Sequence, residues 1–152
     1  MLITDALLGE HSVFYLLFQN IEQALPTFDS ITALQIHLAP LSFALEAHAR
    51  LEDELLFTAL EIHLGTQAGP LVVMRMEHDQ IVNLLAGIQS ASGLAQGRDL
   101  ASQMTEVARG HFQKEEQALF RMARQLLGEN TLYALGVKWA QQRGLLAALD
   151  IP

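Results

Sequence analysis

The sequence predicts an all-α protein, an up-down-up-down antiparallel four-helix bundle with a short C-terminal fifth helix. Four long segments carry apolar residues at alternating steps of three and four, the spacing that gives a helix one buried face. The three connections between them are short, which forces neighbouring helices to run antiparallel. No segment shows the apolar-polar alternation of a strand, so helices account for the whole pattern.

The composition indicates one domain and limits its chemistry. A chain of 152 residues with 51% hydrophobic content can bury a single sizeable core. We expect one domain over 1–152, with the core bundle over about 5–127 and the C-terminal helix and tail over 129–152. Cysteine is absent, which excludes disulfides, thiol catalysis and cysteine-ligated metals. Any metal site must therefore use His, Asp or Glu.

The charge distribution bears on partners and location. The net charge is -8, and the first 49 residues hold five acids and no Lys or Arg, so we expect no nucleic-acid partner. The apolar runs are far shorter than the roughly 20 residues that span a bilayer, so we expect no membrane partner either. The N-terminus lacks the basic region of a signal peptide, which predicts a cytoplasmic protein.

The first two predicted helices form a hairpin around Pro26. The first helix has its buried stripe at Leu7, His11, Phe14, Phe18, Ile21 and Leu25. After the break, Asp29 or Ser30 can cap the second helix. The second stripe contains Leu34, Leu38, Leu41, Leu45, His48, Glu52, Leu55, Ala59 and Ile62, and Gly65 ends it. Pro40 is expected to kink this helix or to mark its true start.

The third and fourth predicted helices form a second hairpin. The third opens at Gly69-Pro70, because proline is favoured at a first helical position, and its stripe is Leu71, Met74, His78, Ile81, Leu85 and Ile88. Gly93 and Gly97 are expected to bracket the next loop. The fourth stripe is Leu100, Met104, Val107, His111, Glu115, Ala118, Met122 and Gln125, closed by Gly128. A weaker fifth helix is expected from about Glu129 to Arg143, followed by an irregular tail over 144–152.

Six ionisable residues interrupt these apolar stripes, namely His11, His48, Glu52, His78, His111 and Glu115. Burying one unpaired imidazole or carboxylate costs several kcal/mol, so six of them facing one interior need a common partner. A cation of charge two or more is the simplest such partner. Helical rise places the paired histidines of each hairpin at similar depth, whereas the connection between the second and third helices must climb part of the bundle.

An internal repeat supports a two-metal site. The segment from His48 to Phe57 matches the segment from His111 to Phe120 as HxxxE[DE]xxLF, 63 residues later. Glu-His pairs at positions 10–11 and 77–78 begin the matching helices. Each hairpin thus supplies one His, then a second His with a Glu one turn later on the same face. Imidazole and carboxylate ligands without sulfur suit iron or manganese more than copper(I).

The pattern H-HxxxE-H-HxxxE on four consecutive helices resembles the hemerythrin-like HHE cation-binding family over about residues 5–127. The resemblance implies two iron ions, with manganese possible, joined by an oxo or hydroxo bridge. It implies that His11 and His48 bind one iron, that His78 and His111 bind the other, and that Glu52 and Glu115 bridge them. Ferritin-like di-iron bundles are the nearest rival, but their signature is Glu-x-x-His, with the reverse order and a spacing of three.

The sequence departs from the oxygen carriers of that family at Met74, where they have a fifth histidine. A thioether is a poor ligand for ferric iron, which leaves one position to water, an exogenous ligand or an oxygen side chain. Tyr15 can hydrogen-bond near the metal or ligate it, although core packing is the favoured interpretation. Four acidic residues are sequence neighbours of the predicted ligands: Glu10, Asp53, Glu77 and Glu116. Their side chains are expected either to face solvent or to hydrogen-bond to the ligands on the side away from the metal. His37 and His63 are interpreted as non-ligands.

Three functions fit these observations. The favoured hypothesis is a module that binds or senses oxygen, nitric oxide or peroxide at a four-His, two-Glu di-iron centre. The second is an enzyme that decomposes peroxide or reduces another small oxide at the same centre. The third is an interaction bundle in which the metal is structural and the apolar C-terminal helix forms a homo-oligomer interface. Capping of the bundle is the preferred role of that helix.

Overall fold

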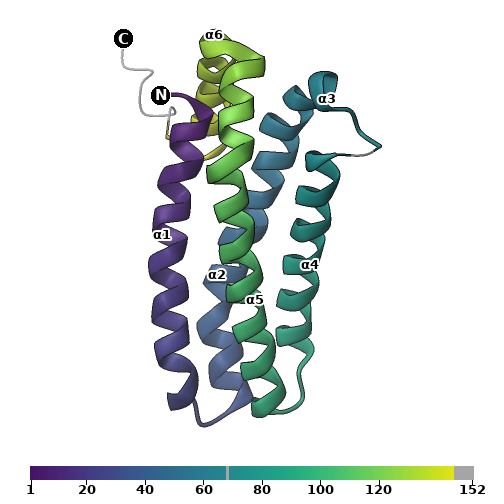
Figure 1. The fold of residues 1–152 in the computed structure, drawn as a ribbon. Coiled ribbons are helices and arrows are strands. Elements are labelled where there is room, and N and C mark those ends of the chain that lie inside the picture. The colour runs from purple at the N-terminus through teal and green to yellow at the C-terminus, as the bar shows by residue number, and fades with distance from the viewer. Residues whose placement is uncertain (68, 146–152) are drawn as a thin grey trace.

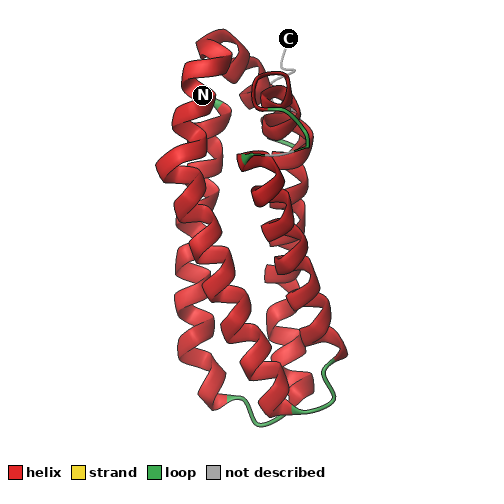
Figure 2. Cartoon of the chain, turned by 45° about the vertical axis from the view of Figure 1, so that its right-hand side comes forward, coloured by secondary structure: helices red, strands yellow, loops and turns green. Residues whose placement is uncertain are grey.

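The computed structural model describes residues 1–67 and 69–145, and every element in these ranges is helical (Figures 1 and 2). The elements are α1 (Ile3–Ala24), η1 (Leu25–Thr27), α2 (Ile31–Leu51), η2 (Glu52–Phe57), α3 (Thr58–Leu64), α4 (Pro70–Ser90), α5 (Leu94–Lys114), η3 (Glu115–Leu119) and α6 (Phe120–Gln142). The predicted all-α bundle is confirmed. No helix in the described ranges is both long and apolar enough to cross a membrane.

The four long helices of the bundle are assembled from more than four elements. α1 and α4 each supply one, whereas α2, η2 and α3 join into the second helix, and α5, η3 and the start of α6 join into the fourth (Figure 1). Gly128 interrupts α6 with φ 72° and ψ 163°, the positive φ that glycine adopts without strain. The rest of α6, from Glu129, is the predicted fifth helix. Residues 146–152 of the predicted tail lie outside the described residues.

The predicted helix ends are largely correct. Pro26 lies in the short η1 turn, and the Ser30 hydroxyl accepts a hydrogen bond from the Ala33 amide, so Ser30 rather than Asp29 caps α2. Pro40 lies inside α2 and does not mark its start. Pro70 is the first residue of α4. In Figure 1, α4 begins lower in the bundle than the end of α3, consistent with the expected climb between them.

The prediction for Gly97 is wrong, because this residue lies inside the first turns of α5. A Cβ atom at position 97 would stand 2.4 Å from Cδ1 of Ile31 and 3.1 Å from Cδ2 of Leu34. The glycine therefore permits α5 to approach the start of α2 closely, and it does not belong to a loop. Gly93 directly precedes α5, as predicted.

A π-helical segment begins at the glutamate of each HxxxE motif and changes which later residues are buried. A π turn contains one more residue than an α turn and rotates everything that follows it. After η2, in α3, the buried position moves from the expected Ala59 to Leu60, and Ile62 is 89% exposed. In η3, burial likewise moves on by one residue, from Ala118 to Leu119 and from Met122 to Ala123, and Gln125 is exposed. Leu55 is buried as predicted, but the continuous α-helical stripe predicted beyond Leu55 and beyond Glu115 is wrong for this reason.

The apolar core consists of two clusters with a polar layer between them. One cluster lies at the end of the bundle that holds the N-terminus and the fifth helix, and it includes Leu7, Leu51 and Met74. The other fills the opposite end and includes Phe14, Leu45 and Ile81. His11, His48 and His78 each stand between one residue of either cluster along their own helices. The two clusters thus hold the polar layer from both sides.

Candidate metal centre

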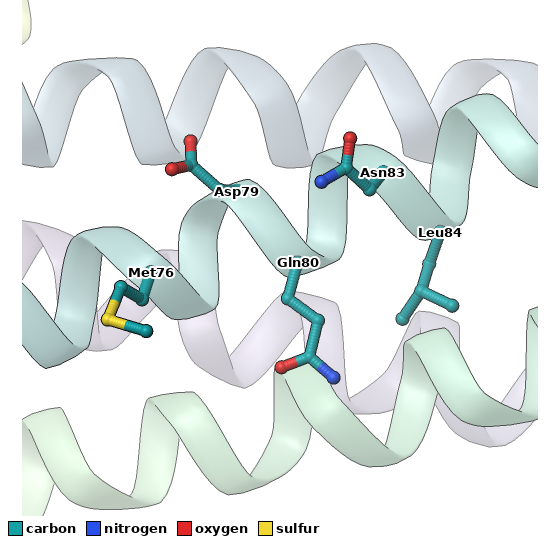
Figure 3. A pocket seen from close by; sticks show the side chains of 5 residues that line it. All are labelled: Met76, Asp79, Gln80, Asn83 and Leu84. Atoms are coloured by element: carbon teal, nitrogen blue, oxygen red, sulfur yellow. The ribbon is translucent and has the colours of Figure 1, made fainter.

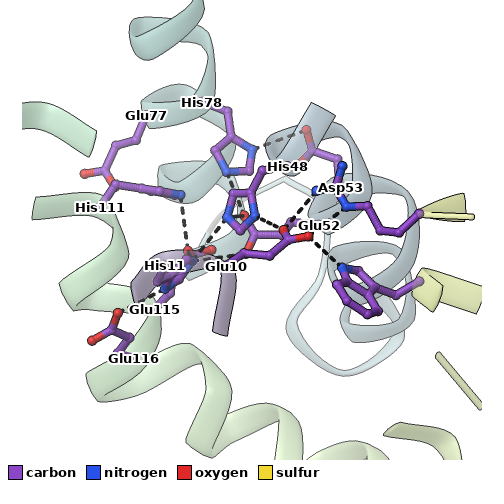
Figure 4. Close-up of polar contacts among 12 residues, drawn as sticks. Glu10, His11, His48, Glu52, Asp53, Glu77, His78, His111, Glu115 and Glu116 are labelled. Carbon is purple, nitrogen blue, oxygen red and sulfur yellow. Dashed lines mark hydrogen bonds and ion pairs between the residues drawn. The ribbon is translucent and has the colours of Figure 1, made fainter. Parts of the chain in front are cut away.

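The structure brings all six predicted ligands into the polar layer. His11 comes from α1, His48 from α2, His78 from α4 and His111 from α5, and the two glutamates begin the π segments η2 and η3 (Figure 4). Every one of the six is at most 5% exposed. Only two other polar residues, Thr4 and Thr105, are buried within the described ranges. The ionisable groups of the interior are therefore concentrated at this one place.

The six side chains form two overlapping groups of four. One group is His11, His48, Glu52 and Glu115, the other is Glu52, His78, His111 and Glu115, and within each group one ligand atom per residue lies within 4.8 Å of the others. Both glutamates belong to both groups. Each group offers two imidazole nitrogens and two carboxylate oxygens, a donor set that suits a divalent or trivalent first-row metal.

The Nε2 atoms of the histidines face the carboxylates. Nε2 of His48 and Nε2 of His78 lie 3.3 Å and 3.4 Å from the same Oε2 atom of Glu52. Nε2 of His11 and Nε2 of His111 lie 3.4 Å and 3.5 Å from Oε2 of Glu115. Two nitrogens, those of His11 and His48, stand only 3.2 Å apart. Such separations are those of atoms that converge on a shared point rather than of well-formed hydrogen bonds.

The opposite nitrogen of each imidazole, Nδ1, contacts a carboxylate from another helix. Glu10 Oε2 lies 2.6 Å from Nδ1 of His48, and Glu77 Oε2 lies 3.0 Å from Nδ1 of His111. An Nδ1–H donated to a carboxylate fixes the ring orientation and leaves Nε2 free to bind a metal. The same type of contact joins the remaining two pairs, His78 to Asp53 at 3.3 Å and His11 to Glu116 at 3.0 Å.

These four carboxylates are the acids that flank the predicted ligands in the sequence, and Figure 4 shows Asp53, Glu77 and Glu116 toward the edge of the group. Glu10 precedes His11 but serves His48, and Glu77 precedes His78 but serves His111. Asp53 and Glu116 follow the two buried glutamates and serve His78 and His11. Each acid points away from its neighbouring ligand because adjacent residues on a helix differ by about 100°. The internal repeat of the sequence thus becomes a two-fold arrangement in space.

In the protein without metal, the pKa values of the two central glutamates are shifted in opposite directions. Burial raises the pKa of Glu115 well above its usual value, and the nearby carboxylate of Glu52 raises it further. Burial also acts to raise the pKa of Glu52, but His48, His11 and His78 outweigh it and hold that pKa well below its usual value. Two carboxylates sharing one buried site cannot both ionise without a positive partner.

The histidines of the second hairpin are similarly divided. Burial lowers the pKa of His78, but contacts with Asp53 and Glu52 outweigh it and raise this pKa to about 9. Burial and the charge of His78 lower the pKa of His111 to about 4. The chain alone therefore settles on a mixed set of charged and neutral groups, whereas metal binding needs neutral imidazoles and ionised carboxylates.

The unpartnered atoms indicate what the centre can hold. Among the described residues, both carboxylate oxygens of Glu52 and of Glu115, and Nε2 of His78 and of His111, are buried without a hydrogen-bond partner. Buried polar atoms normally have such partners, and their loss costs about 1–3 kcal/mol each. All of these atoms face the point where the two groups of four overlap. The residues therefore fit bound metal.

Aromatic rings enclose the centre. The ring of Phe112 stacks on His11 with centroids 4.0 Å apart, and Phe120 stacks on the same imidazole at 5.5 Å. Phe57 stacks on His78 at 5.3 Å. Both Phe57 and Phe120 are the last residues of the repeated motif. Apolar walls of this kind exclude water and strengthen electrostatic interactions inside the site.

The remaining candidates lie outside the six-residue centre. The Tyr15 hydroxyl donates to Glu116 Oε1 at 2.9 Å, so it supports the carboxylate behind His11. Burial and the Glu116 carboxylate raise the pKa of Tyr15, which keeps the phenol a donor. Met74 is 5% exposed and packs in the apolar cluster, as expected of core filler. His37 is exposed, so it does not share the buried stripe, and His63 is exposed near the end of α3.

A separate hollow of about 550 Å³ lies on the outer side of α4, where Figure 3 shows Met76, Asp79, Gln80, Asn83 and Leu84. All five side chains come from this one helix, and Met76 is 66% exposed. None of them belongs to the six-residue centre. The hollow is an open part of the α4 surface, apart from the metal centre.

The class of protein follows from the fold and the centre: a helical bundle with buried His and Glu clusters suited to metal ions. The hemerythrin HHE cation-binding domain family matches this chain over residues 2–123. The chain belongs to that family. No curated protein and no solved structure matches it significantly. The match ends before the fifth helix, which begins at Glu129.

Proposed function

We propose that this protein binds two iron ions and uses them to bind or sense a small oxidant or gas, namely oxygen, nitric oxide or peroxide. The observation that carries the proposal is the pair of overlapping groups that share Glu52 and Glu115. A single metal ion would use only one of these groups and would leave the Nε2 atoms of two buried imidazoles without a metal ion to bind. Two ions use all six side chains.

The roles of the residues follow from their positions. His11 and His48 hold one ion, His78 and His111 hold the other, and Glu52 and Glu115 contribute to both. The outer carboxylates orient the four imidazoles through Nδ1. Iron, when bound, supplies redox chemistry and open coordination positions. Manganese fits the same donor set, and metal analysis decides between the two.

The size and polarity of the surroundings favour a small ligand. The six side chains are almost fully buried, and phenylalanine rings cover His11 and His78. A diatomic gas or peroxide can reach such a centre through small fluctuations of the packing, whereas a larger substrate needs a preformed cleft. Met74 offers no imidazole next to His78, so we expect one coordination position to stay available to the exogenous ligand.

The test begins with protein purified without chelators. Metal analysis should find about two irons per chain, and the visible spectrum should show the absorption of a coupled ferric pair. Added nitric oxide, oxygen and peroxide should each be followed by the change in that spectrum. A stable, reversible change supports binding or sensing, whereas sustained peroxide consumption would instead assign the alternative enzyme function.

His48→Ala removes one ligand and should lower the metal content, while His37→Ala, an exposed histidine on the same helix, serves as the matched control. A protein that holds a single zinc, or no metal at all, would refute the di-iron proposal.

The remaining alternative is an interaction bundle. In the fifth helix, Leu132, Leu135 and Trp139 are buried against the bundle and Tyr133 is 55% exposed. A homo-oligomer through this helix therefore stays a prediction, to be tested by sedimentation.

A further inference from the structure

The fifth helix reaches the centre through Glu10. Oε2 of Glu10 lies 2.6 Å from Nδ1 of His48. Oε1 of Glu10 accepts hydrogen bonds from Nε1 of Trp139 at 3.1 Å and from Nε of Arg143 at 2.7 Å. Nη2 of Arg143 also donates to Oε2, at 2.9 Å. One carboxylate therefore connects a predicted ligand to two residues of the C-terminal region, both beyond the family match at residues 2–123.

The symmetry-related carboxylate is supported differently. Glu77, the counterpart of Glu10, contacts His111 and forms an ion pair with Lys114 of α5. The side chain of Lys114 is 55% exposed. Arg143 instead offers Glu10 two donors in a planar fork, and Trp139 is 8% exposed. A forked guanidinium restrains a carboxylate more strongly than a single flexible ammonium does.

We infer that Trp139 and Arg143 are positioning residues that hold Glu10 against His48, so that the C-terminal helix makes the two metal positions unequal. The inference rests on the proposed di-iron function and adds to it. The internal repeat gives both metal positions the same types of ligand. The difference between the positions arises from the residues that contact Glu10 and Glu77. The position built on His11 and His48 depends on the fifth helix for its geometry.

The expected size of the effect comes from the role of the carboxylate. A carboxylate on Nδ1 fixes the tautomer and orientation of a ligating imidazole, and its loss commonly lowers metal affinity by about 10-fold to 100-fold. The side chain of Glu10 is 17% exposed. Without its anchors it can turn toward solvent and release His48. Removing both anchors should therefore act on one metal position and spare the other.

The experiment uses the full chain loaded with iron-57. The variant is Trp139→Phe with Arg143→Met, which keeps apolar bulk and removes the three donor atoms. Stepwise iron affinities come from chelator competition, and Mössbauer spectra report the two irons separately. We expect one affinity to fall by about 10-fold or more, with a change in one quadrupole doublet. Lys114→Met should change the other doublet. Arg143→Lys, with Trp139 retained, should keep most of the wild-type signal.

Leu132→Ala is the control for a purely structural effect. Leu132 lies in the same helix and is 1% exposed, but it belongs to the apolar cluster and has no bond to Glu10 among the described contacts. It should lower the melting temperature and leave both doublets unchanged. If Leu132→Ala changes the same doublet as the double variant, the effect is general destabilisation and the positioning role is refuted.

Two other outcomes separate this inference from the proposed function. Wild-type protein that binds two irons, together with a double variant of wild-type affinities and spectra, overturns the inference alone. Wild-type protein that binds no iron overturns both. Should the double variant not fold, Trp139→Phe and Arg143→Met carry the same test singly, because each removes part of the anchor. Identical spectra in both would again reject the positioning role.

Discussion

Replacing Glu115 by methionine should stabilise the metal-free protein while it weakens metal binding. Glu115 is fully buried, and neither of its carboxylate oxygens has a hydrogen-bond partner among the described residues. The contacts with Nε2 of His11 and His111, at 3.4 Å and 3.5 Å, are too long to compensate. Burial and the neighbouring Glu52 raise its pKa well above the usual value, so the group is neutral and poorly solvated without metal.

The magnitude follows from this lack of partners. An unsatisfied buried polar group costs about 1–3 kcal/mol, and methionine has similar volume without that cost. We therefore expect Glu115→Met to raise the free energy of unfolding of the metal-free protein by about 1–3 kcal/mol. For a domain of this size, 1 kcal/mol corresponds to about 2–4 °C, so the melting temperature should rise by roughly 2–12 °C.

The assay is thermal unfolding followed by circular dichroism, with and without saturating ferrous iron under anaerobic conditions. Metal at 100 times its dissociation constant should add about 2.7 kcal/mol to the wild type, whereas the variant should gain much less because it lacks a shared carboxylate. Glu106→Met, at an exposed position of α5, should change neither value. A metal-free Glu115→Met protein that melts below the wild type would refute the argument that this carboxyl group is a cost without metal.

Three further predictions concern metal, pH and packing, and one concerns the third-helix register. Chelation of the wild type should lower its melting temperature. Burial acts to raise the pKa values of Glu10 and Glu77, but bonds to imidazoles and cations outweigh it and lower both pKa values below the usual 4.5. The stability that these carboxylates contribute is therefore present above about pH 4.5 and lost as the pH falls. Urea unfolding midpoints of the metal-free protein should accordingly be lower at about pH 3 than at about pH 6. Gly136→Ala places a Cβ 2.3 Å from the Met1 carbonyl oxygen, so hydrogen exchange in the fifth helix should quicken. If the open coordination position is what reacts with peroxide or takes up small ligands, Met74→His should slow any peroxide consumption and prolong any oxygenated spectrum. Unchanged rates and spectra at full iron occupancy would show that position 74 does not face the metal.

The sequence is sufficient for the fold class, and the six residues that it predicts as ligands lie together in the structure. Each depends on a repeated, local signal: the three-four spacing for the helices, and ionisable residues on apolar stripes for the site. The π segments η2 and η3 are not predicted by the sequence, because the three-four spacing describes a continuous α-helix and has no place for the extra residue of a π turn. One signal was present in the repeat. The Leu-Phe pairs at 56–57 and 119–120 do not fit the α-helical stripe, although apolar residues repeated in this way are normally buried.

The outer carboxylates were noticed in the sequence, but their partners could not be assigned. Glu10 stands next to His11, yet its partner is His48 on another helix. The pairing depends on how far each helix is rotated about its axis, and no local pattern reports that rotation. The roles of Trp139 and Arg143 were hidden for the same reason, because they contact Glu10 across more than a hundred positions of sequence.

The crossed contacts of the outer acids have a consequence for assembly. Each acid shares a rigid turn with one ligand and restrains a ligand on a different helix, as Glu116 does between Glu115 and His11. A helix that slides or rotates therefore disturbs its own ligand and the one it restrains. The geometry of the centre therefore depends on helix register. A bundle with one helix displaced by a turn cannot keep both of the proposed metal positions. Misalignment of the second or the fourth long helix should therefore disturb both proposed metal positions, because each carries a ligand of one position and an acid that restrains a ligand of the other, whereas misalignment of α1 or α4 should disturb only one.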